Sequence, residues 1–440
     1  MQMKQSINKE YYIEKQSSFF SKKKTARPLR EGLDQMLNVQ QGRKTLVEIN
    51  NMDVYYGSGK KKFRAINDFS IKIFEGEVLG LVGESGSGKT TVGMALAGLI
   101  SHQFGQIKIA GERLPHKNSK IKKKLNEFLA NKVQMIFQDP ANSLNPNKNI
   151  FDIISEGLDN LSRKNKGYLL ELTLFNFDQD FVSLIFEKYF STFFKNSEEK
   201  EERFNFISEK LSIPDLEIIY EIYDKWPKKY SNKELIEDIE KAKKKRQEIS
   251  KQSLKDLKYN LIVKILKDVG LDEVVLRRYP LEFSGGQQQR IGISRAVVLR
   301  PKLLIADEPI SALDVSIQAQ VVNIFNDLKK QYKLTILFIA HDLRMVEYIS
   351  DRIAVMYQGV LLEIGPAKEI MNNSIHPYTK SLLEAVPSIE SKVGSLIGYV
   401  YDPKKHQYTK ENQPKWIDLG NDHFVLATDQ ELNNWKKNIY

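Results

Sequence analysis

The sequence contains no cysteine among its 440 residues, which excludes disulfide bonds and metal or iron–sulfur sites held by cysteine. No apolar run approaches the roughly eighteen residues that a membrane-spanning helix needs. Residues 1–30 are polar and basic, so they lack the apolar core of a signal peptide. Hydrophobic residues make up 41% of the chain, which is enough for a buried core. These features predict a cytoplasmic protein, unless a partner holds it at a membrane.

The charge is unbalanced, with a formal net charge of +11. Such an excess is compatible with a nucleic-acid or anionic partner. However, much of it lies in four short runs scattered between unlike segments, namely Lys22–Lys24, Lys60–Lys62, Lys122–Lys124 and Lys243–Arg246. We therefore favour solvated surface and expect no nucleic-acid partner, while loose attraction to acidic lipid headgroups stays open.

Strand-like and helix-like segments alternate on both sides of a helical middle region, which predicts an α/β fold with a mostly parallel sheet. Ligands of such sheets bind at the carboxyl ends of the strands. The expected organisation begins with a flexible basic N-terminal arm (1–45) and a first part of the α/β core (46–140). A helical subdomain (141–300), which includes an insertion at about 160–260, separates it from a second part of the core (301–365) and a C-terminal extension (366–440).

A glycine-rich stretch, GESGSGKT at Gly83–Thr90, fits the phosphate-loop pattern G-x-x-x-x-G-K-[ST]. It follows an apolar strand expected at Val78–Val82 and opens a helix, an order that disfavours a glycine-rich turn without a ligand. Lys89 is expected to bridge the β- and γ-phosphates of ATP, and the Thr90 hydroxyl to hold Mg²⁺. The residues expected to bind ATP here are Gly83, Glu84, Ser85, Gly86, Ser87, Gly88, Lys89, Thr90 and Thr91.

Further polar residues follow expected strands. Asp307 and Glu308 end the run LLIADEP, where Asp307 is expected to reach Mg²⁺ and Glu308 to act as general base. A pair of acids after a strand is also compatible with a helix cap, but the phosphate loop favours catalysis. His341 follows the strand at Thr335–Ala340 and is expected to contact the γ-phosphate and the attacking water. Gln138 follows another strand and is expected to sense the same phosphate and the metal.

An aromatic ring is expected to stack on adenine. Tyr56 is the first candidate and Phe63 the second, because both precede the phosphate loop in a strand-rich segment.

The stretch FSGGQQQR at Phe283–Arg290 resembles the signature motif of ATP-binding cassette (ABC) ATPases. The phosphate loop, Gln138, this motif, Asp307–Glu308, the run SALD and His341 occur in that superfamily's order. The resemblance implies a RecA-like core, an antiparallel β subdomain and a helical subdomain. It also implies a head-to-tail cassette dimer, in which the signature of one cassette contacts ATP bound by the other. The residues implied are Ser284, Gly285, Gly286 and Gln287 for the signature, and Ser311 and Asp314 for the dimer seam.

Several longer runs resemble the ATPases of oligopeptide and dipeptide importers, and within them the F subunit type. They are MIFQDPANSLNP (Met135–Pro146), ADEPISALDVSIQAQVVN (Ala306–Asn323), SDRIAVMYQG (Ser350–Gly359) and HPYTKSLLEAVP (His376–Pro387). This resemblance implies a D-type second cassette, two integral membrane subunits and an extracytoplasmic peptide-binding protein. It places the chain at the cytoplasmic face of the cell membrane as a peripheral subunit. Some relatives carry an iron–sulfur cluster, which a chain without cysteine cannot ligate in the usual way.

The chain departs from this family pattern between about Asn160 and Asn260, where it is longer than the family needs. We favour a packed helical insertion on the solvent side over a partner contact. Repair-type ABC ATPases carry a coiled coil there, but no apolar heptad is sustained in this region. A soluble nucleic-acid ATPase and a nickel or glutathione importer of the same subgroup stay as alternatives. Residues 391–440 support no interpretation.

Overall fold

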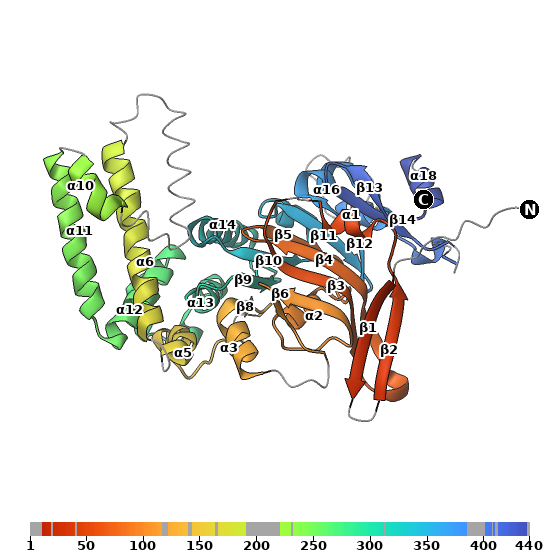
Figure 1. Ribbon diagram of the computed structural model, residues 1–440, viewed down its shortest axis with the longest axis horizontal. Coiled ribbons are helices and arrows are strands. Elements are labelled where there is room, and N and C mark those ends of the chain that lie inside the picture. Colours follow the sequence, from red (N-terminus) through yellow and green to blue (C-terminus); the bar gives the residue numbers. More distant parts are fainter. Residues whose placement is uncertain are drawn as a thin grey trace, which may run out of the picture. The chain divides into compact units, whose positions relative to one another are not determined.

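The computed structural model describes residues 11–18, 21–39, 42–116, 122–139, 143–162, 166–190, 221–229, 232–311, 313–384, 401–406, 408–409 and 412–437. The chain divides into two compact units, and Figure 1 labels most of their helices and strands. The first unit consists of residues 1–139, 301–329 and 334–440. The second consists of residues 140–300 and 330–333.

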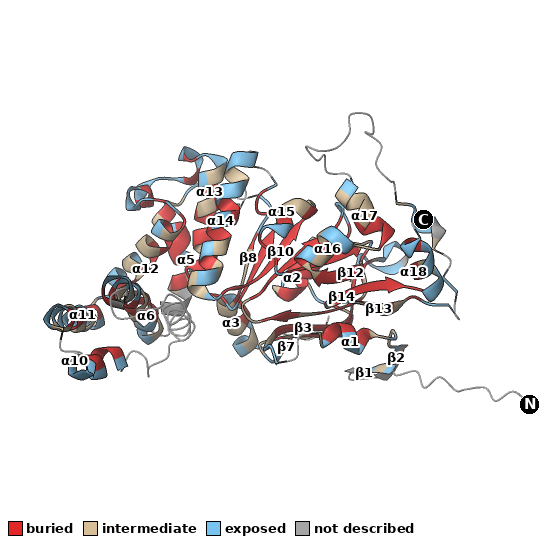
Figure 2. Cartoon of the chain, turned by 90° about the horizontal axis from the view of Figure 1, so that it is seen from above, coloured by how far each residue is buried: buried red, intermediate tan, exposed pale blue. Residues whose placement is uncertain are grey.

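The core of the first unit is an eight-stranded sheet with the order β13-β14-β12-β11-β5-β10-β9-β8. The strands are β5 (Val78–Val82), β8 (Val133–Ile136), β9 (Leu303–Asp307), β10 (Thr335–Ala340), β11 (Arg352–Tyr357), β12 (Val360–Pro366), β13 (Lys415–Gly420) and β14 (His423–Ala427). The five strands from β8 to β11 run parallel, and the other three pair antiparallel. Every residue of β5, β9 and β10 is buried, as expected of parallel strands covered on both faces. Figure 2 shows β10 in the colour of buried residues.

Helices follow the parallel strands, which confirms the predicted mostly parallel α/β sheet. They are α2 (Lys89–Leu96) after β5, α14 (Val315–Tyr332) between β9 and β10, and α15 (Leu343–Glu347) after β10. The helix α3 (Lys123–Lys132) leads directly into β8. The carboxyl ends of β5, β8, β9 and β10 therefore lie along the same edge of the sheet, where the candidate site residues begin.

A second, antiparallel sheet of four strands also belongs to the first unit, with the order β4-β3-β6-β7. Its strands are β3 (Thr45–Tyr56), β4 (Phe63–Phe74), β6 (Phe104–Ile109) and β7 (Glu112–Arg113), and a short 3₁₀ turn, η1 (Gly59–Lys61), joins the first two. This sheet corresponds to the antiparallel subdomain that the family resemblance implies. It brings Tyr56 and Phe63 together as a cross-strand pair.

The N-terminal region has regular structure, in contrast to the flexible arm expected over residues 1–45. A hairpin of β1 (Tyr11–Ser18) and β2 (Ser21–Pro28) is followed by α1 (Leu33–Leu37). The local pattern does not indicate this hairpin, whose residues Glu14 and Arg27 bond to positions far along the chain. Residues 1–10 of the expected arm lie outside the described residues.

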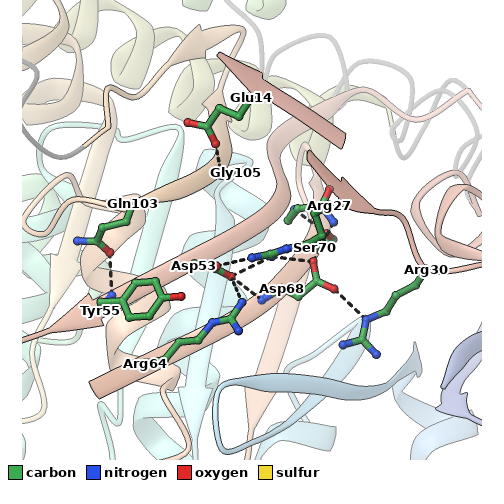
Figure 3. Close-up of polar contacts among 11 residues, drawn as sticks. Glu14, Arg27, Arg30, Asp53, Tyr55, Arg64, Asp68, Ser70, Gln103 and Gly105 are labelled. Atoms are coloured by element: carbon green, nitrogen blue, oxygen red, sulfur yellow. Dashed lines mark hydrogen bonds and ion pairs between the residues drawn. The ribbon is translucent and has the colours of Figure 1, made fainter. Parts of the chain in front are cut away.

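A cluster of charges joins this hairpin to the antiparallel sheet (Figure 3). The Asp53 carboxylate, whose side chain is 2% exposed, accepts hydrogen bonds from Arg27 at 2.5 Å and from Arg64 at 2.7 Å. Asp68 accepts from Arg27 at 3.1 Å and from Arg30 at 2.9 Å. Burial raises the pKa of Asp68, but the charges of Arg30 and Arg27 and the bond from Asn51 leave it below its ordinary value.

We expect Asp53→Asn to lower the free energy of unfolding by about 3 kcal/mol, because Arg27 and Arg64 lose their buried anion. Urea unfolding followed by circular dichroism measures this loss. The control is Lys44→Ala, which removes a pair with Glu75 whose side chains are 74% and 36% exposed. That change should cost less than about 1 kcal/mol. Equal losses in the two variants would contradict a structural role for the buried cluster.

The described residues of the second unit form helices and no strands. They are α5 (Ile150–Ser162), α6 (Lys166–Ile185), η2 (Phe186–Phe190), η3 (Glu221–Lys225), α10 (Trp226–Lys229), α11 (Lys233–Lys251), α12 (Leu254–Asp268), η4 (Glu273–Arg277), η5 (Pro280–Glu282) and α13 (Gly285–Val297). Within the region from 160 to 260, α6, η2, η3, α10 and α11 enclose an apolar cluster that includes Tyr223, Trp226 and Ile239. The buried Asp178 accepts hydrogen bonds from Tyr223 and Arg246 at 3.0 Å each. The described part of this region therefore has an apolar core of its own, while residues 191–220 lie outside the description.

The C-terminal region contains α16 (Ala367–Asn373), α17 (Pro377–Glu384), η6 (Pro403–Lys405) and α18 (Asp429–Lys436), besides β13 and β14. Residues 391–440 support no interpretation from sequence, yet β14 pairs with β12 and extends the main sheet. Trp435 and Leu432 of α18 pack with Val425 and Ala427 of β14. Among the described residues, no helix combines the length and apolar character that crossing a membrane requires.

Candidate active site

The phosphate loop connects β5 to α2 at the carboxyl edge of the main sheet. Gly86 and Gly88 have φ angles of 81° and 103°, which favour glycine. A side chain on Gly83 would meet the carbonyl oxygen of Met356 at 2.1 Å, so this position has no room for one. The Ser87 hydroxyl is buried and has no hydrogen-bond partner among the described residues. The loop thus has the shape and an unsatisfied polar group that a phosphate ligand fits.

Lys89, at the start of α2, points back into the loop. It is 4% exposed, and its ammonium donates hydrogen bonds to the carbonyls of Gly83 at 2.7 Å and Glu84 at 2.9 Å. Burial lowers the pKa of Lys89, and the charges of Glu308 and Asp307 oppose this shift. These two carboxylates support the charged form, which is the form that attracts phosphate.

Asp307 ends β9 beside the loop. Its Oδ1 accepts a hydrogen bond of 3.0 Å from the Thr90 hydroxyl, 217 positions earlier in the sequence. Burial raises the pKa of Asp307, and the bond from Thr90 acts in the opposite direction. The Thr90 hydroxyl and the Asp307 carboxylate are oxygen donors of the kind that Mg²⁺ prefers, and the amide of Gln138 donates to the neighbouring Glu308. The described residues contain no group of three or more histidine or acidic side chains arranged to hold a metal.

Glu308 contacts residues that follow two other strands of the sheet, β8 and β10. Its Oε2 accepts a hydrogen bond of 3.2 Å from the Gln138 amide and lies 3.4 Å from His341 Nδ1. The backbone N–H of Glu308 donates to the carbonyl of Ile339 in β10, which fixes the start of the turn. Glu308 also has a φ of 45°, a conformation that a residue with a side chain adopts at a cost and that is common at functional sites. The three residues expected around the γ-phosphate thus meet at one carboxylate.

The two candidate adenine-stacking rings lie at the end of the β3–β4 hairpin. The Tyr56 hydroxyl lies 3.3 Å from the Thr91 hydroxyl on α2, and the ring is 41% exposed. Phe63 is its cross-strand partner and is 66% exposed. Both rings are accessible, and the contact with Thr91 links Tyr56 to the phosphate-loop helix.

The signature motif lies in the second unit, at the start of α13. Ser284 is the N-cap residue, and its N–H donates to Oε1 of Gln287 at 3.1 Å. Ser284, Gly285 and Gln287 are exposed, so the first turn of a 13-residue helix is accessible. Such a helix start attracts anions. The side chain of Gln287 serves as part of the cap.

The two expected seam residues lie in the turn after β9. The Ser311 hydroxyl donates to the carbonyl of Glu308 at 3.1 Å, so it holds the turn that carries the acidic side chain. Asp314 is exposed and precedes α14. Ala312 between them lies outside the described residues.

One further residue contacts the phosphate loop, and the sequence alone indicates no function for it. Tyr378, in the run HPYTKSLLEAVP, accepts a hydrogen bond of 2.8 Å from the backbone N–H of Glu84. The run resembles a family motif, but nothing in its local pattern indicates contact with the phosphate loop.

Comparisons with known proteins agree with this geometry. A model of the ABC transporter family matches residues 66–311, and a model of the oligopeptide/dipeptide transporter C-terminal region matches residues 362–411. The oligopeptide transport ATP-binding protein OppF of Streptococcus pyogenes serotype M1 is 38% identical over 397 residues, which cover 90% of this chain and 99% of that protein. The dipeptide transport ATP-binding protein DppF of Lactococcus lactis subsp. cremoris is 38% identical over 402 residues, covering 90% and 98%.

A similar solved structure is that of cbiO1 from Clostridium perfringens, part of the ABC transporter complex cbiONQ. It has a TM-score of 0.47 and 18% sequence identity, and the match covers 75% of this chain and 92% of cbiO1.

Proposed function

The chain belongs to the ABC transporter ATPases, in their oligopeptide/dipeptide branch, and we propose that it hydrolyses ATP to power the uptake of oligopeptides. The observation that carries this proposal is the carboxylate of Glu308, which Gln138 and His341 flank at the sheet edge that also holds the phosphate loop. A carboxylate with a polar amide and an imidazole beside it is suited to orient and deprotonate water.

We assign the binding roles from these contacts. Lys89 and the backbone N–H groups of the loop other than that of Glu84 would hold the β- and γ-phosphates, after the ammonium exchanges its carbonyl acceptors for phosphate oxygens. Tyr56 would stack on adenine. Thr90, Asp307 and Gln138 would hold Mg²⁺, which when bound neutralises charge on the phosphates.

The chemistry assigned to the chain's own residues is hydrolysis of the terminal phosphate. Glu308 would accept a proton from water, and His341 would donate a hydrogen bond to the γ-phosphate and keep the water in place. Transition-state charge on the phosphate would be stabilised by Lys89 and the loop N–H groups.

A complete site would need a second cassette. The exposed start of α13, with Ser284, Gly285 and Gly286, would contact ATP bound by a partner cassette, and Ser311 and Asp314 would line the seam. The partner would be a D-type ATPase, so that two unlike subunits enclose the nucleotides head to tail. Hydrolysis would release the two cassettes from each other.

Transport would require further partners. Two integral membrane subunits would provide the path for the peptide and hold this chain at the cytoplasmic face of the membrane. An extracytoplasmic binding protein would deliver the peptide. The names of the relatives supply the substrate class in this proposal, because the transported molecule does not contact the ATPase site.

Isolation of the tagged full chain from detergent-solubilised membranes tests the assembly. Mass spectrometry should find two integral membrane proteins and a second ABC ATPase in stoichiometric amounts. The matched control is the same extract from cells with an untagged chain. Recovery of nucleic acid without membrane proteins would contradict the proposal and favour a soluble nucleic-acid ATPase. In cells, deletion of the gene should abolish uptake of a radiolabelled oligopeptide. A loss confined to nickel or glutathione uptake would change the proposed substrate class.

A further inference from the structure

The peptide group between Gly83 and Glu84 in the phosphate loop is held from both sides. Its carbonyl oxygen accepts a hydrogen bond of 2.7 Å from the ammonium of Lys89. Its N–H, which belongs to Glu84, donates a hydrogen bond of 2.8 Å to the hydroxyl of Tyr378. Because a peptide group is planar and turns as one body, these two bonds together determine its orientation.

The two bonds differ in how they relate to nucleotide binding. Lys89 is the residue proposed to bind phosphate oxygens, so its bonds to the Gly83 and Glu84 carbonyls compete with that role. Tyr378 has no such second role, and its bond to the N–H of Glu84 is compatible with a phosphate in the loop. This hydroxyl is therefore the contact suited to hold the peptide group while Lys89 changes acceptors.

Tyr378 is itself fixed in place. Its side chain is fully buried, at 0% exposure, and its own backbone N–H donates to Nδ1 of His376 at 3.1 Å. Its ring centroid lies 4.6 Å from that of Tyr357 and 5.3 Å from that of Tyr401. Burial raises the pKa of Tyr378, so the hydroxyl stays protonated at neutral pH.

These rings belong to one aromatic cluster, which we define as Tyr357, His376, Tyr378, Tyr401, His406 and Trp435. His376 is fully buried and lies 4.9 Å from the ring of Trp435, which belongs to α18. His406 lies 2.6 Å from a carboxylate oxygen of Glu431 on the same helix. The cluster thus forms a continuous packed path from the C-terminal helix to the phosphate loop.

We infer that Tyr378 is a positioning residue for the phosphate loop and that its hydroxyl contributes to the affinity for ATP. The hydroxyl fixes the Gly83–Glu84 peptide group in the orientation that the bound loop needs. The inference rests on the proposed ATPase function and deepens it. It assigns a part of the nucleotide site to residues that follow the last strand of the parallel sheet.

The test is the variant Tyr378→Phe, which keeps the ring in the aromatic cluster and removes the acceptor for the N–H of Glu84. Loss of one neutral hydrogen bond should raise the Kd and KM for ATP by about 3- to 10-fold. The value of kcat should stay within about two-fold, because Glu308 and His341 are unchanged. Hydrogen–deuterium exchange should become faster in peptides that cover residues 83–88. If Tyr378 had only a structural role, the variant would have a lower melting temperature, but its KM would not rise while kcat stayed the same.

The matched control is Tyr401→Phe, which removes a hydroxyl from the same cluster. That hydroxyl lies 2.6 Å from Nε2 of His406. The control should leave the Kd for ATP unchanged, whatever its effect on the melting temperature. The inference is overturned if Tyr378→Phe binds ATP as the wild-type chain does, or if both variants lose affinity equally. If the wild-type chain bound no ATP, the proposed function itself would be overturned. If only Tyr378→Phe gave an unexpected result, the inference alone would be overturned.

Discussion

Replacement of Glu308 by Gln is expected to leave ATP binding intact and to lower the rate of hydrolysis by about 100-fold or more. Glutamine has nearly the same shape as glutamate, and it still accepts the hydrogen bond from Gln138. It cannot, however, accept a proton from water. Since nucleotide enters and stays, the proposed cassette dimer should accumulate in its closed form. Steady-state ATPase assays and size-exclusion chromatography with ATP measure the two effects.

The control for this prediction is Glu347→Gln on α15, an identical chemical change at an exposed residue close in sequence to His341. It should hydrolyse ATP at the wild-type rate. If Glu308→Gln also hydrolysed ATP normally, the general base would have to be another residue.

The second large effect is expected for Lys89→Ala, which should weaken ATP binding by about 100-fold or more. Removal of the ammonium leaves two or three phosphate charges near Asp307 and Glu308 without a nearby cation from the loop. A Coulombic interaction of this kind is strong because the site is buried, with Lys89 at 4% exposure. Isothermal titration calorimetry with ATP measures the affinity, and circular dichroism verifies that the variant is folded.

The control is Lys123→Ala, which removes one positive charge, as Lys89→Ala does, but at an exposed residue of α3. Its affinity for ATP should match that of the wild-type chain. Unchanged hydrolysis in Lys89→Ala would remove the assignment of the phosphate loop.

The central part of the site was predictable because its residues follow short apolar strands directly. Gly83, Asp307 and His341 each come after a run that reads as a buried strand, and parallel strands end at one edge. The sequence therefore indicates which residues meet, although it shows no distance between them. The bond between Thr90 and Asp307 is an example of a contact that the topology implies.

Other contacts were not predictable because they join segments that have no shared local pattern. The hairpin of β1 and β2 depends on Arg27 and its contacts with Asp53 and Asp68, and an arginine in a basic segment does not by itself indicate such partners. The bond between Tyr378 and the N–H of Glu84 spans 294 positions. The pairing of β14 with β12 likewise depends on tertiary structure.

The position of β5 in the main sheet has a consequence for synthesis on the ribosome. Both hydrogen-bonded neighbours of β5 come late in the chain, since β10 begins at Thr335 and β11 at Arg352. At about 5–20 residues per second, the ribosome needs on the order of 10–50 s after Val82 to reach them. Residues 160–260 lengthen this interval. During that time the apolar strand before the phosphate loop must be shielded by chaperones or by transient contacts, so expression of this chain should be sensitive to the supply of nascent-chain chaperones.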